Sequence, residues 1–153
     1  MNDVSPDFAA YEVKHATFLR MEAEAAPANK AALFEALAGA GIHTVTLMFD
    51  GSGDSGQIES LDAFSGENVV MPLPGTAIAF KEVVWDGLLV LTRQRGITDV
   101  IETMANALLE QTHEGWEDGD GAYGEFTFTV EGQTITLEYN ERHMESDYHC
   151  HEF

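Results

Sequence analysis

The chain has 153 residues, of which 44% are hydrophobic, and its 7 Lys and Arg against 27 Asp and Glu give a formal net charge of −20. The apolar content predicts a packed domain and excludes a disordered chain, whereas the charge disfavours direct binding to nucleic acid or to an anionic membrane. A single cysteine, Cys150, no apolar run of membrane-spanning length and no signal-peptide pattern together predict a cytoplasmic protein.

The first 40 residues are predicted to be helical. Because the residue before a proline avoids the helical conformation, we expect Pro27 to end the first helix. A second helix is predicted over 28–40, where Leu33, Phe34 and Leu37 share one face.

After these helices the period of the apolar residues changes from about 3.6 to 2, which indicates strands. The alternation predicts strands at 43–50 and 57–64 and a short extended piece at 69–73. The segment 76–95 is long enough for a helix, but it is rich in Val and Ile and is interrupted by Gly87, so we expect extended structure.

A helix is predicted over about 98–113, with Thr98 as its N-cap and an apolar stripe on one side. Two alternating segments, 123–130 and 134–139, are joined by Glu-Gly-Gln and predict a hairpin.

This order of elements predicts an α+β fold in a single domain, 1–153. We expect a helical N-terminal segment, 1–40, followed at 41–153 by a mostly antiparallel sheet of about 4–6 strands, with the helices packed on one face.

The stretch FDGSGDSGQIE at 49–59 contains three motifs at once. Its glycines match a phosphate-binding loop, but the following residues alternate like a strand and supply no helix N-terminus. Its GDSG matches the surroundings of a serine nucleophile, but no base or orienting acid accompanies Ser55. Its first ligands match an EF-hand calcium loop, but that loop needs glycine at its sixth position and glutamate at its twelfth, and here these positions are Ser55 and Leu61. The simplest interpretation is a polar turn between two strands.

Two metal sites remain as alternatives. If the loops 50–56 and 118–124 converge, their carboxylates could bind Ca²⁺ or Mg²⁺, since these ions prefer oxygen ligands; the candidate ligands are Asp50, Asp54, Asp118 and Asp120. In a strand, His149 and His151 would face the same side, which is a workable geometry for a transition metal. The alternative for this C-terminal stretch is a polar tail or edge strand.

The segment 115–126 holds two aromatic residues among acids. Arginine can stack on such rings while carboxylates accept its N–H groups, so the segment is a candidate site for a basic partner. With the neighbouring acidic loop, the candidate partner-binding residues are Asp50, Asp54, Glu59, Trp116, Glu117, Asp118, Asp120, Tyr123 and Glu125. The alternative for Trp116 is that it covers the core at the end of a helix.

The strings GDSGQIE at 53–59, GWE-x-x-DGAYGEF at 115–126, TITLEYNER at 134–142 and the terminal HEF occur in this order. This pattern resembles an uncharacterised family of small acidic bacterial proteins that is associated with plasmids and other mobile elements. The resemblance implies no activity, cofactor or catalytic residue.

Three hypotheses on function follow. The first is a non-enzymatic protein that binds a basic protein surface, and its sharper form is a nucleic-acid mimic that acts in mobile-element counter-defence against restriction or CRISPR systems. The second is a divalent-cation protein or metal-dependent enzyme that uses clustered carboxylates in the 50–59 and 118–125 loops. The third is a small accessory protein that forms a homodimer. The sequence contains no catalytic triad, P-loop or complete ligand set, so we favour binding over catalysis.

Overall fold

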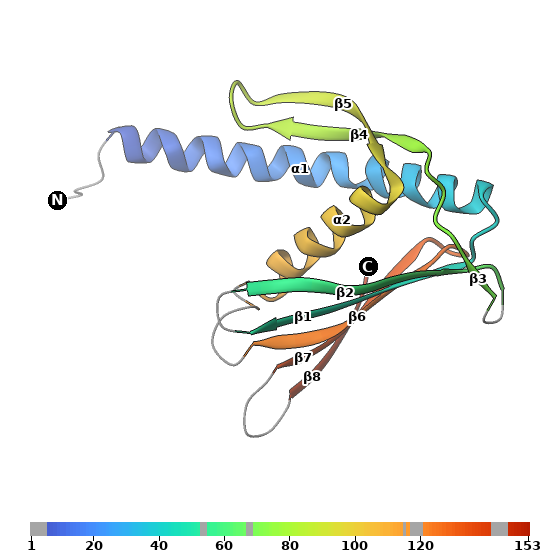
Figure 1. The fold of residues 1–153 in the computed structure, drawn as a ribbon. Helices are drawn as coiled ribbons and strands as arrows, with labels where there is room; N and C mark the ends of the chain where they lie inside the picture. Colours follow the sequence, from blue (N-terminus) through green and yellow to red (C-terminus); the bar gives the residue numbers. More distant parts are fainter. Residues whose placement is uncertain (1–5, 53–54, 67–68, 115, 117–120, 142–146) are drawn as a thin grey trace.

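The structure is a computed structural model, and it describes residues 6–52, 55–66, 69–114, 116, 121–141 and 147–153. The elements in this part of the chain are α1 (Pro6–Gly39), β1 (Thr44–Ser52), β2 (Ser55–Phe64), β3 (Val70–Met71), β4 (Ala77–Val84), β5 (Leu89–Gly96), α2 (Ile97–Thr112), β6 (Ala122–Thr129), β7 (Thr134–Glu141) and β8 (Asp147–Glu152). Both helices lie on the same side of a large sheet, and the β4–β5 hairpin lies against α1 on the side away from that sheet (Figure 1).

The large sheet has six strands in the order β3-β2-β1-β6-β7-β8, and every neighbouring pair is antiparallel. Strands β4 and β5 form a separate two-stranded sheet. The predicted α+β class with a mostly antiparallel sheet is therefore confirmed. The predicted hairpin is β6–β7, and the segment 76–95, expected to be extended, is β4–β5, with Gly87 at a positive φ of 82° in its turn.

The core lies between the helices and one face of the large sheet. Successive side chains of a strand point to opposite faces, so β1, β6 and β7 present their apolar side chains to the helices. The buried side chains include Val45, Leu47 and Phe49 of β1, Phe126 and Phe128 of β6, Ile135, Leu137 and Tyr139 of β7, Leu33, Phe34 and Leu37 of α1, and Val100, Ile101, Ala105 and Leu109 of α2.

Two predictions about helix ends are wrong. Pro27 does not end a helix, because α1 runs from Pro6 to Gly39 without a break. A proline inside a helix removes one backbone hydrogen bond and crowds the preceding turn. Here Ala25 and Asn29 on either side of it are buried against other elements, and this tertiary packing offsets the local penalty.

Thr98 is not the N-cap of α2. β5 runs directly into the helix, so the cap is Gly96, which has no side chain with which to make a capping bond. Arg95, at the end of β5, instead binds the first two turns of α2. Its Nε donates to Asp99 Oδ2 at 2.7 Å, and its Nη2 donates to Thr103 Oγ1 at 2.9 Å. The Arg95 hydrogen bond holds the pKa of Asp99 below its usual range.

The β4–β5 hairpin is fastened to α1 at two points. Near its tip, the Trp85 ring lies against Phe18, with ring centroids 5.3 Å apart, and Lys14 Nζ lies 4.5 Å from the same ring. Further along, the Asn29 side chain donates to the Lys81 carbonyl at 3.0 Å and accepts from the Lys81 N–H at 2.7 Å. A two-stranded sheet leaves alternate backbone groups unpaired at its edges. Asn29 pairs with the backbone N–H and carbonyl of Lys81 in β4, as the backbone of a further strand would.

We predict that Asn29→Ala destabilises the protein by about 1–3 kcal/mol, because Asn29 is 6% exposed and its loss leaves two backbone groups of Lys81 without their partner. Urea denaturation measures this change. Gln94→Ala on the exposed strand β5 is the control, with an expected change within about 0.5 kcal/mol. Equal stabilities of the two variants would contradict the role given to Asn29.

Trp116 joins the segment after α2 to the β1–β2 hairpin. Its indole packs edge-on against Phe49, with ring centroids 5.2 Å apart, and lies directly on Gly56. A Cβ at position 56 would be 2.6 Å from Cζ2 of the indole, so no larger residue fits without a shift of the ring. The last glycine of the G-x-G-x-x-G pattern is thus explained by packing against Trp116.

We predict that Gly56→Ala costs about 1–3 kcal/mol of stability through overpacking. The same substitution in a Trp116→Leu background should cost much less, because the smaller side chain leaves room, and a double-mutant cycle in denaturant measures the coupling. Gly75→Ala is the control, since a Cβ there would meet nothing within 4 Å. A coupling energy near zero would rule out the contact as the reason for glycine.

Candidate functional site

The described parts of the two Asp- and Gly-rich segments are neighbours in the large sheet. Asp50 is the register partner of Tyr123, and Gly51 that of Ala122, so the end of β1 lies beside the start of β6. Of the predicted site residues, Asp54, Glu117, Asp118 and Asp120 lie outside the described residues.

One face of the large sheet, here called the acidic face, is turned away from both helices (Figure 1). It carries the side chains that alternate with the core positions of each strand. Glu59 lies at the bulge in β2, and its carboxylate accepts a hydrogen bond at 2.8 Å from the side chain of Gln57. Since Gln57 is the register partner of Asp50, this contact places the Glu59 carboxylate with the acidic face. The described acids of this face are Asp50, Glu59, Asp62, Glu125, Glu138 and Glu152, and its large apolar or aromatic side chains are Met48, Tyr123 and Tyr148.

Like charges are neighbours at the centre of the acidic face. Glu125 and Glu138 are register partners across β6 and β7, and directly opposed like charges weaken a sheet. Met48, which is 48% exposed, adjoins Glu125 on the other side. Within the described part of the six-stranded sheet there is no Lys or Arg to compensate.

Basic residues are segregated from this face. Those that the structure describes lie on α1, β4 and β5, and they are Lys14, Arg20, Lys30, Lys81, Arg93 and Arg95. The arginines are engaged locally: Arg20 lies 3.8 Å from Glu24, Arg93 lies 2.8 Å from Glu82, and Arg95 is bound to Asp99. Among the described residues, α1, β4 and β5 therefore carry charges of both signs, whereas the six-stranded sheet carries only acids.

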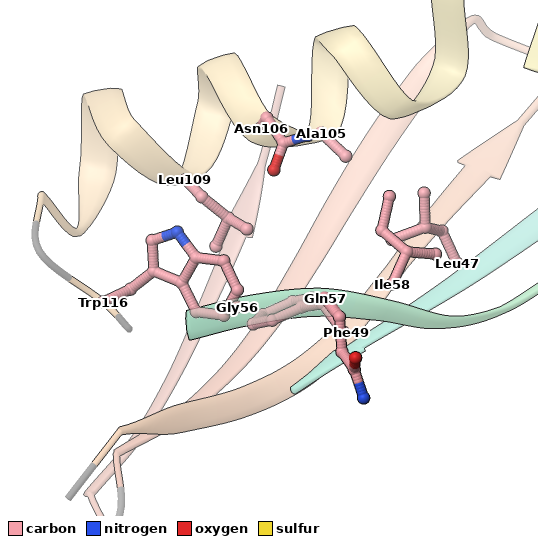
Figure 2. Close-up of a pocket in the computed structure, with 9 residues that line it drawn as sticks. All are labelled: Leu47, Phe49, Gly56, Gln57, Ile58, Ala105, Asn106, Leu109 and Trp116. Carbon is pink, nitrogen blue, oxygen red and sulfur yellow. The ribbon is translucent and has the colours of Figure 1, made fainter. Parts of the chain in front are cut away.

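Trp116, a predicted partner-binding residue, is only 8% exposed. Its indole forms one wall of a small pocket between α2 and the β1–β2 hairpin, with Leu47, Ile58 and Leu109 (Figure 2). The pocket holds about 140 Å³, which is below the roughly 300–1,000 Å³ of most small-molecule sites. Trp116 covers the core at this point, so little of its ring is accessible to a partner, and its role in partner binding stays a prediction.

The predicted histidines of β8 meet a third histidine from a distant element. His113, the C-cap of α2, has its Nε2 2.9 Å from Nε2 of His151, and its ring centroid lies 5.3 Å from that of His149. The His113 ring stacks on Tyr139 at 3.6 Å between centroids. Burial, and then the nearby His151 and His149, hold the pKa of His113 below its usual range.

Sequence reasoning missed His113 and the acids Asp62, Glu138 and Glu152. His113 follows the end of a helix, and no local pattern connects it with the C-terminal strand. The three acids could have been found by extending the alternation of each strand to its outward positions.

Within the described residues, no group of three or more His, Cys, Asp or Glu is arranged to hold a metal ion. The carboxylate site for Ca²⁺ or Mg²⁺ stays a prediction, because three of its four ligands are not described. The same part of the chain contains no helix with the length and hydrophobicity needed to cross a membrane.

Exposed apolar side chains also occur on the N-terminal half of α1 and on β5, namely Phe8, Tyr11, Val13, Leu19, Leu89, Val90 and Leu91. The homodimer expected from the sequence stays a prediction, and these are apolar side chains that such an interface could cover.

No curated protein and no solved structure matches the chain. A family model matches residues 25–153, which include the acidic face, the Gly56–Trp116 contact and the three histidines, whereas the first half of α1 lies outside the match. The chain belongs to DUF6878, a family of unknown function.

Proposed function

We propose that this protein is a non-enzymatic binding protein whose acidic face engages a basic protein surface. The observation that supports the proposal most is the Glu125–Glu138 pair, which lies on an uncovered face with no described Lys or Arg on the same sheet.

The reason is energetic. Opposed carboxylates on a sheet reduce its stability, and a protein without a need for them could replace either one. A partner that brings lysine or arginine to this face relieves the repulsion, so the cost to the free protein becomes part of the driving force for association.

The composition of the face suits arginine in particular. Tyr123 and Tyr148 are exposed beside the carboxylates, and a guanidinium can stack on such a ring while its N–H groups bind a carboxylate. Met48 adds an adaptable apolar contact in the same row as Glu125.

The sharper form of the proposal is nucleic-acid mimicry. Carboxylates on several adjacent strands form an extended array, and such an array can occupy the basic groove of a DNA-binding protein by the attraction that phosphates exert. A counter-defence role in mobile elements is the setting that this form of the proposal suggests.

We predict that neutralising the acidic face with Asp62→Asn, Glu125→Gln and Glu138→Gln weakens partner binding by at least about tenfold, because it removes charges that meet the basic partner. Affinity capture at low and high salt, followed by mass spectrometry, identifies the partner. Calorimetry on the purified pair then measures the affinity. Competition by duplex DNA distinguishes a mimic from another acidic ligand.

The control carries the same charge change on the helices: Glu12→Gln, Glu35→Gln and Glu110→Gln, three exposed positions. Its affinity should stay near that of the parent protein. If the helix variant loses binding and the acidic-face variant does not, the proposed surface is wrong.

Glu138→Gln alone is expected to raise the free energy of unfolding by about 0.2–1 kcal/mol, since it removes the repulsion across β6 and β7. Denaturation in urea at low salt measures this gain, and added salt should reduce the difference between variant and parent. A destabilised variant would show that the pair is not a cost to the free protein.

A further inference from the structure

We propose that His113 and His151 bind one borderline divalent cation, Cu²⁺ or Ni²⁺, through their Nε2 atoms. This transition-metal site lies between the end of α2 and β8, on the opposite side of the sheet from the acidic face. This inference does not depend on the proposed binding function.

The first support is the convergence of two ring nitrogens. Nε2 of His113 and Nε2 of His151 are 2.9 Å apart and come from elements 38 positions apart in the chain. Two unprotonated nitrogens would repel at this distance. Either one ring donates its Nε2–H to the other, or a metal ion beside the line that joins the two nitrogens binds both.

The spacing of the two nitrogens suits one coordination geometry without rearrangement of the side chains. With metal–nitrogen bonds of about 2.0–2.1 Å, two nitrogens 2.9 Å apart subtend roughly 90° at the metal. That angle is the one between neighbouring positions of a tetragonal site, which Cu²⁺ and Ni²⁺ prefer, whereas a tetrahedral zinc pair would be about 3.3–3.4 Å apart.

The surroundings favour a cation. His113 caps the C-terminal end of α2, where the helix dipole is negative, and the last turn of α2 contains no basic residue. Burial lowers the pKa of His113, whereas the nearby carboxylate of Glu141 on β7 raises it by attracting positive charge. Hard ions such as Ca²⁺ and Mg²⁺ prefer oxygen and are not expected here.

The orientation of one ligand is fixed in advance, and the site is open to solvent. The His113 ring is stacked on Tyr139 with an interplanar angle of 7°, which restricts its rotation. His113 and His151 are both partly exposed, and His149 beside them is exposed. The remaining coordination positions are therefore accessible to water or to a further ligand.

The test uses the full chain without a histidine tag, in a Cys150→Ser background because that exposed thiol would react with Cu²⁺. Calorimetry with Ni²⁺, and titration with Cu²⁺ followed by electron paramagnetic resonance, should show one ion per chain with nitrogen ligands. His113→Phe, which keeps the stacking on Tyr139, and His151→Phe should each weaken binding by at least about tenfold.

His43→Phe is the matched control, since this exposed histidine lies before β1 and outside the cluster. Its affinity should equal that of the parent, and thermal melting checks that all variants are folded. The proposal is overturned if folded His113→Phe and His151→Phe bind Ni²⁺ as tightly as the parent, or if His43→Phe loses as much affinity as they do.

Discussion

The alternation of side chains along the strands of the large sheet is the constraint on which the rest of the structure depends. Val45, Leu47 and Phe49 point to one side of β1, and the same phase continues through β6 and β7. Only one face of the sheet is apolar enough to pack against helices, so α1 and α2 share that side. The opposite face is left to solvent and carries the paired acids, because a strand that buries one set of side chains must expose the other.

The second organising feature is the long helix α1, which contacts elements on two of its sides. Its C-terminal half places Phe34 against Phe128 of the large sheet, while Asn29 and Phe18 hold the β4–β5 hairpin. This arrangement explains why Pro27 is accommodated: the energy that keeps the helix continuous comes from packing on both sides. The described basic residues lie on α1, β4 and β5 and not on the strands of the large sheet, and Lys30 of α1 reaches the edge of that sheet, where its Nζ donates to the Phe153 carbonyl at 3.0 Å.

The end of α2 connects the core with the histidine cluster. Trp116 packs on Phe49 and Gly56, and Phe49 lies near Tyr139, on which His113 stacks. The histidine cluster and the acidic face therefore share the same supporting strands but open to opposite sides of the sheet. Binding at one of them need not obstruct the other.

The sequence by itself determined the α+β class, the positions of most strands and of α2, and the acidic character, because periodicity and composition are local properties. It could not decide whether α1 continues through Pro27, since that depends on packing against distant strands. Nor could it show that Trp116 lies on Gly56, that Glu125 faces Glu138, or that His113 meets His151. These contacts join residues far apart in the chain, and only strand register and helix placement bring them together.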